Sequence, residues 1–215
     1  MVSRPGMDAL HAILARRSVS RLVEPAPTGD DLHRILEAAA AAPDHGELRP
    51  RKFVILHGPA KDAFGQVLAA AYLARTDAVG AAPTAGQLTK ERTKLGRAPL
   101  VVVVAALHRH SDKIPWEEQF AAAAASAQNA LVAATALGYG SMWRTGDAAY
   151  DSRVKDALGL GPHDAIVGFL YLGTPPDDAE TGVRPRVMDG LVEHWQPAPP
   201  AGPHGAGHEG GVSRP

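Results

Sequence analysis

Basic and hydroxyl side chains cluster near the N-terminus in the sequence Arg16-Arg17-Ser18-Val19-Ser20-Arg21. Guanidinium and hydroxyl groups at this spacing could hold a phosphate through charge-assisted, bidentate hydrogen bonds. The cluster also follows a predicted helix, and basic residues favour the C-terminal ends of helices because they compensate the helix dipole. Taken alone, the cluster favours dipole compensation over a phosphate site.

Two further polar segments lie next to predicted strands. The first, Ala42-Pro43-Asp44-His45-Gly46, precedes a strand, and its histidine suits either a ligand contact or a solvated loop. The second, Gly140-Ser141-Met142-Trp143-Arg144-Thr145-Gly146, runs from a strand into a polar turn. Because residues at strand ends often line sites in layered α/β folds, the second segment is a candidate binding site.

Composition and motifs exclude several kinds of site. The chain has no cysteine, which excludes disulfides, iron–sulfur clusters, thiolate zinc sites and cysteine nucleophiles. A formal net charge of -1 argues against a nucleic-acid binder. The glycines in Gly138-Tyr139-Gly140 follow a predicted helix and open a strand, the reverse of a dinucleotide-binding loop, so they indicate a helix C-cap. His108-Arg109-His110 has no further ligand at useful spacing, so no metal site is expected.

Hydrophobic periodicity predicts a layered domain. Strands are expected at residues 53–56, 100–107, 140–143 and 165–172, and helices at 8–17, after a Thr28 cap, at 59–74, 87–95, 115–137 and 151–158. The unbroken apolar run from Val101 to Val104 indicates a strand buried on both faces. This order predicts an α+β (α/β layered) fold, with one sheet flanked by helices.

The longest uncharged stretch, Gln119 to Trp143, does not indicate a membrane span. Its length would suffice to cross a bilayer, but it is mostly alanine with interspersed polar residues. Such a helix is typical of a domain centre or a subunit interface. The N-terminus shows no apolar signal-peptide core, so we expect a cytoplasmic protein without membrane association.

The C-terminal residues 197–215 are nearly all proline, glycine, alanine and histidine. A segment of this composition cannot build a core, so we expect a disordered tail. The folded domain is expected to span residues 7–196.

The order and spacing of these segments resemble the nitroreductase family of FMN-dependent oxidoreductases, in particular its short bacterial, YdjA-like branch. The similarity covers about residues 7 to 175. The residues that carry it are Arg16-Arg17-Ser18, Glu24-Pro25-Ala26-Pro27-Thr28, Ala42-Pro43-Asp44-His45, Arg97-Ala98-Pro99, Trp116-Glu117, Trp143-Arg144 and the ending Ile166-Val167-Gly168-Phe169-Leu170-Tyr171-Leu172-Gly173-Thr174-Pro175.

The resemblance implies a nitroreductase-like fold with a central, mostly antiparallel sheet, assembled as a homodimer with FMN at the subunit interface. Residues 176–195 would wrap the partner subunit. The implied FMN-binding residues are Arg16, Arg17, Ser18, Ser20, His45, Trp143, Arg144 and Thr145. The implied contact region for the nicotinamide nucleotide is Ala133, Ala134, Thr135, Ala136, Leu137 and Gly138.

The implied chemistry is ping-pong hydride transfer. NADPH or NADH reduces the flavin at N5 and leaves, and a nitroaromatic, quinone or similar small oxidant then takes the electrons. Because the flavin does the chemistry, no catalytic side chain is expected. The alternatives are a flavin-modifying relative, a non-catalytic FMN-binding store or sensor, and a cofactor-free interaction protein with the alanine-rich helix as its dimer seam.

Two positions depart from the pattern of the family. Many relatives carry lysine or arginine where this chain has Ser20, and that cation stabilises charge on the reduced flavin. Arg21 or Arg144 are candidates to replace it. The usual Gln-Pro-Trp reads Arg49-Pro50-Arg51 here, and these two cations suggest an anionic substrate or the phosphate of NADPH.

Overall fold

The computed structural model describes residues 8–180 and 182–197 of the 215-residue chain. The chain divides into two units, residues 1–184 and 185–215, and the first carries all the helices and strands that are described. The described part of the second unit exposes apolar side chains, namely Val187, Met188, Leu191, Val192 and Trp195. The expected limits of the folded domain stay a prediction, and the expected tail lies outside the described residues except for its first residue, Pro197.

One antiparallel sheet forms the centre of the first unit. Its strands are β1 (Arg51–His57), β2 (Leu100–Ala106), β3 (Gly140–Arg144) and β4 (Ala165–Gly173), in the spatial order β1-β2-β4-β3. All three strand pairs are antiparallel, with Val102 opposite Ile55 on one side and Leu170 on the other. The expected α+β fold with an antiparallel sheet is therefore confirmed.

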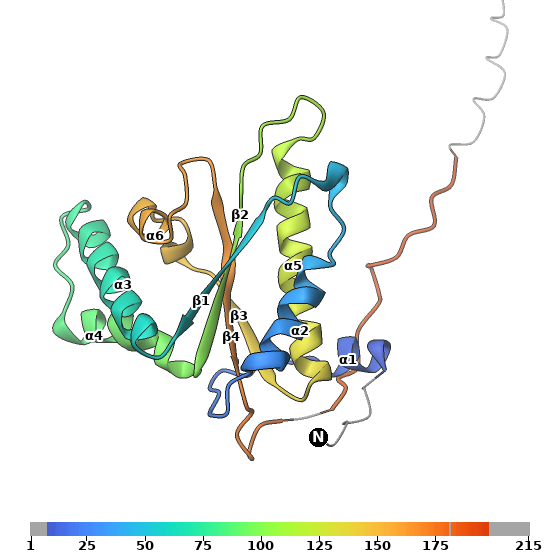
Figure 1. Cartoon of the computed structure of the whole chain (residues 1–215), viewed down its shortest axis with the longest axis horizontal. Helices are drawn as coiled ribbons and strands as arrows, with labels where there is room; N and C mark the ends of the chain where they lie inside the picture. The colour runs from blue at the N-terminus through green and yellow to red at the C-terminus, as the bar shows by residue number, and fades with distance from the viewer. Residues whose placement is uncertain (1–7, 181, 198–215) are drawn as a thin grey trace, which may run out of the picture. The chain divides into compact units, whose positions relative to one another are not determined.

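Helices cover both faces of this sheet (Figure 1), with α3, α4 and α6 on one face and α1, α2 and α5 on the other. Their bounds lie within a few residues of the expected ones. The helices are α1 (Ala9–Ala15), α2 (Gly29–Ala40), α3 (Pro59–Asp77), α4 (Ala85–Thr93), α5 (Trp116–Ala136) and α6 (Ser152–Ala157), with short 3-10 turns η1 (His45–Glu47), η2 (Lys94–Arg97) and η3 (Asp147–Ala149).

The core lies on both sides of β2, and every residue of this strand is buried. Val101 and Val103 pack towards α3 and α6, whereas Val102 and Val104 pack towards α2 and α5. This alternation follows from the two-residue period of a strand. The sequence prediction of burial on both faces is confirmed.

The alanine-rich helix α5 lies against the sheet through its small side chains. Ala123, Ala127, Ala130 and Ala134 follow one another at helical spacing and are almost completely buried. Small side chains let the helix axis approach the strands closely. Among the helices that the structure describes, none is both long and apolar enough to cross a membrane.

Two details of the helices differ from what hydrophobic periodicity and capping patterns predict. The apolar stripe Leu10, Ile13 and Leu14 of α1 is exposed, while Ala12 packs inward. The hydroxyl of Thr28 makes no capping hydrogen bond to α2. The carboxylate of Asp31, three residues after Thr28, accepts a hydrogen bond from the Tyr139 hydroxyl at 2.9 Å. Tertiary partners therefore decide where these side chains point.

Candidate functional site

The arginine-rich segment after α1 runs alongside β3. The N–H of Val19 donates to the carbonyl oxygen of Ser141 at 3.0 Å, and Ser18 and Ser141 form a parallel bridge. This pairing places the first polar segment beside the strand that carries Trp143 and Arg144. The structure therefore brings together two segments that lie far apart in the sequence.

A pocket of about 460 Å³, which we call the arginine pocket, opens around this segment. Three arginines and two serine hydroxyls supply hydrogen-bond donors, and two carboxylates face them. Arg16 does not line the arginine pocket, whereas Arg17, Ser18 and Ser20 do. The arginine pocket is lined by Arg17, Ser18, Val19, Ser20, Arg21, Val23, Pro176, Asp178, Ala179, Glu180 and Arg184.

The guanidinium of Arg17 is held by the segment that follows β4. Its Nη1 lies 2.7 Å from Oε2 of Glu180, and its Nε donates to the carbonyl oxygen of Gly182 at 2.9 Å. Arg184 donates to the same oxygen of Glu180. The hydrogen bond from Arg184 and the charges of both arginines hold the pKa of Glu180 below its usual range. Arg17 thus faces an anion rather than the end of α1, which disfavours dipole compensation for this side chain.

A second pocket, of about 450 Å³, lies beside β3 and β4 and is bordered by α3, α4 and η2. We call it the sheet pocket. Four cationic side chains line it against a single carboxylate, and that carboxylate, Glu91, pairs with Lys94 at 2.5 Å. The lining residues are Leu68, Lys90, Glu91, Lys94, Leu95, Arg97, Met142, Trp143, Arg144, Thr145, Gly146, Phe169 and Tyr171.

Arg144 differs from the other cations of this pocket by carrying a buried donor without a partner in the described part of the chain. Its Nε is buried and has no hydrogen-bond partner among the described residues, and its guanidinium lies 5.8 Å from the centre of the Tyr171 ring. Burial raises the pKa of the Tyr171 hydroxyl, and the charge of Arg144 opposes this rise. A buried N–H without an acceptor costs about 1–3 kcal/mol, so this donor indicates a place for an anionic or polar ligand.

Two cations of the sheet pocket, Lys90 and Lys94, were not predicted from the sequence, and Tyr171 was quoted only as a motif residue. Lys90 and Lys94 belong to a short polar segment without a buried stripe, and such lysines usually indicate a solvated face. Their spacing of four residues, which places both on one side of a helix, was the only available signal. Arg97 lines the pocket as well, although the sequence resemblance used it only as a motif residue.

Trp143 and Arg144 point to opposite faces of the sheet because they are neighbours on a strand. The indole of Trp143 belongs to the core on the α2 and α5 side, and its Nε1 donates to the carbonyl oxygen of Val167 at 3.2 Å. Gly168 makes room for this ring, since a Cβ there would lie 2.2 Å from Nε1. Within this chain, Arg144 and Thr145 therefore face the sheet pocket more directly than the indole does.

His45 lies in η1, away from both pockets. Its Nδ1 is 2.6 Å from Oε2 of Glu118 at the start of α5, and both side chains are exposed. It lines neither pocket within one chain. The expected FMN contact of His45 from across a subunit interface stays a prediction.

The loop that carries His45 is anchored by Arg51. The guanidinium of Arg51 donates to the carbonyl oxygen of Ala40 at 2.8 Å and lies 3.8 Å from the Asp44 carboxylate. The side chain of Arg51 is 11% exposed, whereas Arg49 is exposed. Of the two cations suggested for an anionic substrate, Arg51 therefore has a structural role, and Arg49 alone faces solvent.

The segment expected to contact the nicotinamide nucleotide forms the end of α5. Ala134 is completely buried, and the Thr135 hydroxyl donates to the carbonyl oxygen of Leu131 at 3.0 Å. Gly138, with φ of 85°, ends the helix as the sequence predicts. Neither pocket is lined by residues 133–138. The nucleotide contact of this segment stays a prediction.

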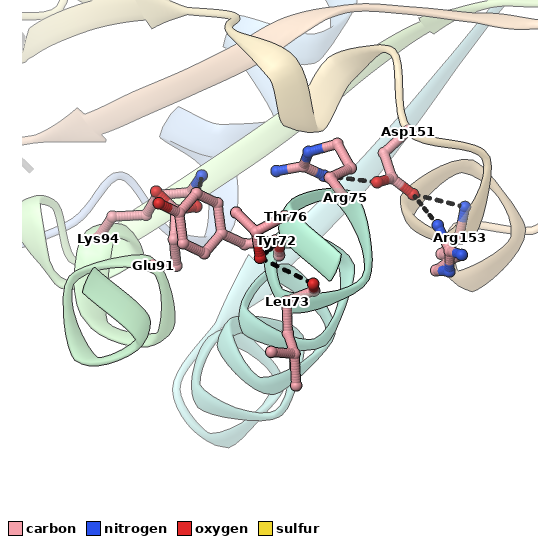
Figure 2. Close-up of polar contacts among 8 residues, drawn as sticks. All are labelled: Tyr72, Leu73, Arg75, Thr76, Glu91, Lys94, Asp151 and Arg153. Atoms are coloured by element: carbon pink, nitrogen blue, oxygen red, sulfur yellow. Dashed lines mark hydrogen bonds and ion pairs between the residues drawn. The ribbon is translucent and has the colours of Figure 1, made fainter. Parts of the chain in front are cut away.

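An ion pair between the partly exposed Arg75 and the buried Asp151 joins α3 to α6 (Figure 2). Asp151 accepts a hydrogen bond from Arg75 at 2.5 Å and from the N–H of Arg153 at 2.9 Å, which caps α6. Burial alone would raise the pKa of Asp151, but the hydrogen bonds and charges of these arginines outweigh it, so the pKa is lowered. The pair fixes α6 to α3, the helix that contributes Leu68 to the pocket wall.

Across the described residues, no group of three or more histidine and carboxylate side chains could hold a metal ion. The His108 ring lies 5.6 Å from the ring centres of both Trp116 and His163. This histidine therefore packs against other rings.

Comparisons with known proteins agree with this architecture. A family model described as the nitroreductase family matches residues 13–174. YdjA of Escherichia coli K12, to which an NAD(P)H nitroreductase activity is provisionally attributed, is 39% identical over 177 residues, covering 82% of this chain and 93% of YdjA.

Two solved structures show the same fold. The nitroreductase-like protein of Bacillus cereus is 22% identical, with a TM-score of 0.73, covering 91% of this chain and 100% of that chain. The nitroreductase of Bacteroides fragilis, solved with bound FMN, is 23% identical and has a TM-score of 0.65. The match covers 88% of this chain and 100% of that chain. The match of the family model over most of the chain, and the close relative, lead to one conclusion: the chain belongs to the nitroreductase family.

Proposed function

We propose that this chain is an FMN-dependent oxidoreductase that passes hydride from NADPH or NADH to a nitroaromatic, quinone or similar small oxidant. The observation that carries the proposal is the placing of two cation-lined pockets beside β3, where Ser18 pairs with Ser141. The relative YdjA, with its NAD(P)H nitroreductase name, supports the proposed reductant. A cytoplasmic location is part of the proposal, because NAD(P)H is supplied there.

The donor set of the arginine pocket fits the phosphate of FMN. Arg17 and Arg21 provide planar guanidinium donors, and Ser18 and Ser20 provide hydroxyls that line the same space. Charged and hydroxyl donors of this kind form the strong hydrogen bonds that phosphate oxygens accept. The FMN-bound relative from Bacteroides fragilis supports this cofactor.

The sheet pocket fits the ring system. When bound there, FMN would supply the hydride-transfer chemistry that the side chains lack. Lys90, Lys94, Arg97 and Arg144 would stabilise the negative charge that the ring gains on reduction. These cations would take the place of the basic residue that many relatives carry at the position of Ser20. Among them, Arg144 carries the buried donor without a described partner.

The two substrates would use the same side of the ring in turn, in a ping-pong sequence. The chain's part is to orient the ring and to hold charge near it, with no side chain required as a general acid.

We further propose that the active form is a homodimer. Leu10, Ile13 and Leu14 expose one apolar face of α1, and Phe120 of α5 is 37% exposed. Helix α1 packs on α5, so these side chains belong to one layer of the fold. An exposed apolar face of this kind is typical of a subunit contact. A partner covering it would also bring a second copy of His45 to the layer.

The purified protein tests this function directly. We expect a yellow protein whose visible flavin absorbance is bleached by NADPH in the absence of oxygen and restored by a quinone. A colourless protein that takes up no added FMN would contradict the proposal. A yellow protein that neither NADPH nor NADH can bleach would instead support the flavin store or sensor.

A further inference from the structure

We propose that Glu180 is an internal counter-ion that occupies the phosphate-binding side of Arg17. A cofactor phosphate must displace this carboxylate, and Glu180 therefore sets the affinity for the cofactor. This inference rests on the proposed FMN site. Glu180 lies in the segment after β4, and no sequence motif pointed to this residue.

The contacts of Arg17 carry the first step of this inference. A phosphate bound in bidentate fashion needs two adjacent N–H donors, and each such pair on a guanidinium includes either Nε or Nη1. Nε of Arg17 already donates to Gly182, and Nη1 lies 2.7 Å from Oε2 of Glu180. A phosphate therefore competes with acceptors of the chain itself.

The position of Glu180 carries the second step. One oxygen of this carboxylate bridges Arg17 and Arg184, as a phosphate oxygen could between two arginines. Both arginines line the arginine pocket, together with Ser18 and Ser20. The carboxylate thus stands among the donors that would hold a phosphate.

Exposure shows which partner can move. The side chain of Arg17 is 16% exposed, whereas that of Glu180 is 73% exposed. The carboxylate can turn into water while the guanidinium stays in place, and exposed ion pairs are worth little. A phosphate with about two charges attracts the arginines more strongly than one carboxylate does. Replacement of Glu180 by a phosphate is therefore favourable. The loss of the ion pair between Glu180 and Arg17 nevertheless weakens the affinity for the cofactor.

The test compares FMN with riboflavin, which has the same ring but no phosphate, on the apo-protein of full length. We expect Glu180→Gln to bind FMN about two- to fivefold more tightly than the wild type, a factor typical of a solvent-exposed ion pair. Riboflavin affinity should not change. Flavin fluorescence titration measures both constants.

Asp177→Asn is the matched control, because Asp177 is exposed, lies in the same segment and does not line the arginine pocket. It should leave both affinities unchanged, and all variants should melt at the wild-type temperature. An equal gain for riboflavin, or in Asp177→Asn, would overturn the inference, since the effect would not be specific to the phosphate. Unchanged FMN binding by Glu180→Gln would overturn it too, and weaker binding would make Glu180 a positioning residue for Arg17.

These outcomes separate the two proposals. A wild-type protein that binds FMN, with no specific gain in Glu180→Gln, overturns only the role of Glu180. A wild-type protein that binds neither flavin overturns the proposed function and this inference together.

Discussion

Neighbouring residues of the same type have different roles in this protein. Arg17 lines the arginine pocket and faces Glu180, whereas Arg16 is the C-cap of α1, and its N–H donates to the carbonyl oxygen of Ala12. Arg51 is mostly shielded from solvent and donates to the carbonyl oxygen of Ala40, whereas Arg49 is exposed. Of the first pair only Arg17 lines the arginine pocket, and the expected FMN contact of Arg16 stays a prediction.

This difference leads to a prediction for the two N-terminal arginines. Arg17→Ala should weaken FMN binding about 10- to 100-fold, the loss expected when a charge-assisted hydrogen bond to phosphate is removed. Arg16→Ala should have a clearly smaller effect. Equilibrium dialysis against FMN measures both variants, and a larger loss for Arg16→Ala would contradict the assignment of Arg17 to the phosphate.

Gly168 of β4 leaves room for the indole of Trp143. A methyl group at position 168 would lie 2.2 Å from the Trp143 Nε1, so the indole or the strand would have to move. We expect Gly168→Ala to lower the free energy of unfolding by about 1–3 kcal/mol, as overpacked cores do. Unfolding in denaturant, monitored by tryptophan fluorescence, measures this loss of unfolding free energy.

The matched control is Gly96→Ala, because a Cβ at that position meets nothing within 4 Å. That variant should unfold like the wild type or slightly later. Equal losses in both variants would show that close packing against Trp143 is not the cause.

The link between α3 and α6 should make stability depend on pH. The pKa of Asp151 is lower in the folded chain than its ordinary value of 3.8, so the unfolded chain binds the proton more readily. The stabilisation is complete above the unfolded pKa and is lost as the pH falls through the lower folded pKa. Asp151→Asn should therefore reduce stability at pH 7 by about 1–3 kcal/mol and flatten its fall between about pH 5 and pH 2.

Asparagine also caps helices, so Asp151→Asn tests the charge and keeps the cap of α6. Asp151→Ala should cost about 1 kcal/mol more, because it also removes the cap. Urea unfolding at several pH values measures both variants. An acid dependence in Asp151→Asn equal to that of the wild type would assign the dependence to other carboxylates.

The exposed apolar face of α1 predicts that two copies of the chain assemble into a dimer. Ile13→Glu should shift the protein from dimer to monomer in light scattering coupled to size exclusion, because it places a charge in the proposed subunit contact. Leu73→Glu is the matched control, since Leu73 on α3 is 47% exposed and Ile13 is 49% exposed. A dimer that Ile13→Glu leaves intact would move the contact to another face.

Much of the fold follows from local patterns in the sequence. The buried valine run of β2, the Pro59 start of α3 and the Gly138 end of α5 were all predictable, because hydrophobic periodicity and capping act over a few residues. The segments of the candidate site were predictable as well, because their order matches a known family.

Other features depend on contacts between distant parts of the chain. Glu180 forms an ion pair with Arg17, which lies 163 residues away. Lys90 of α4 and Lys94 of η2 line the sheet pocket together with residues of β3 and β4 that are far away in the sequence. The exposure of the α1 stripe likewise depends on packing against α5. The elements, the family and the candidate binding segments were predictable from the sequence, since they depend on local pattern and order. Which charged side chains meet was not predictable, because a charge carries no signal of its partner until the chain has folded.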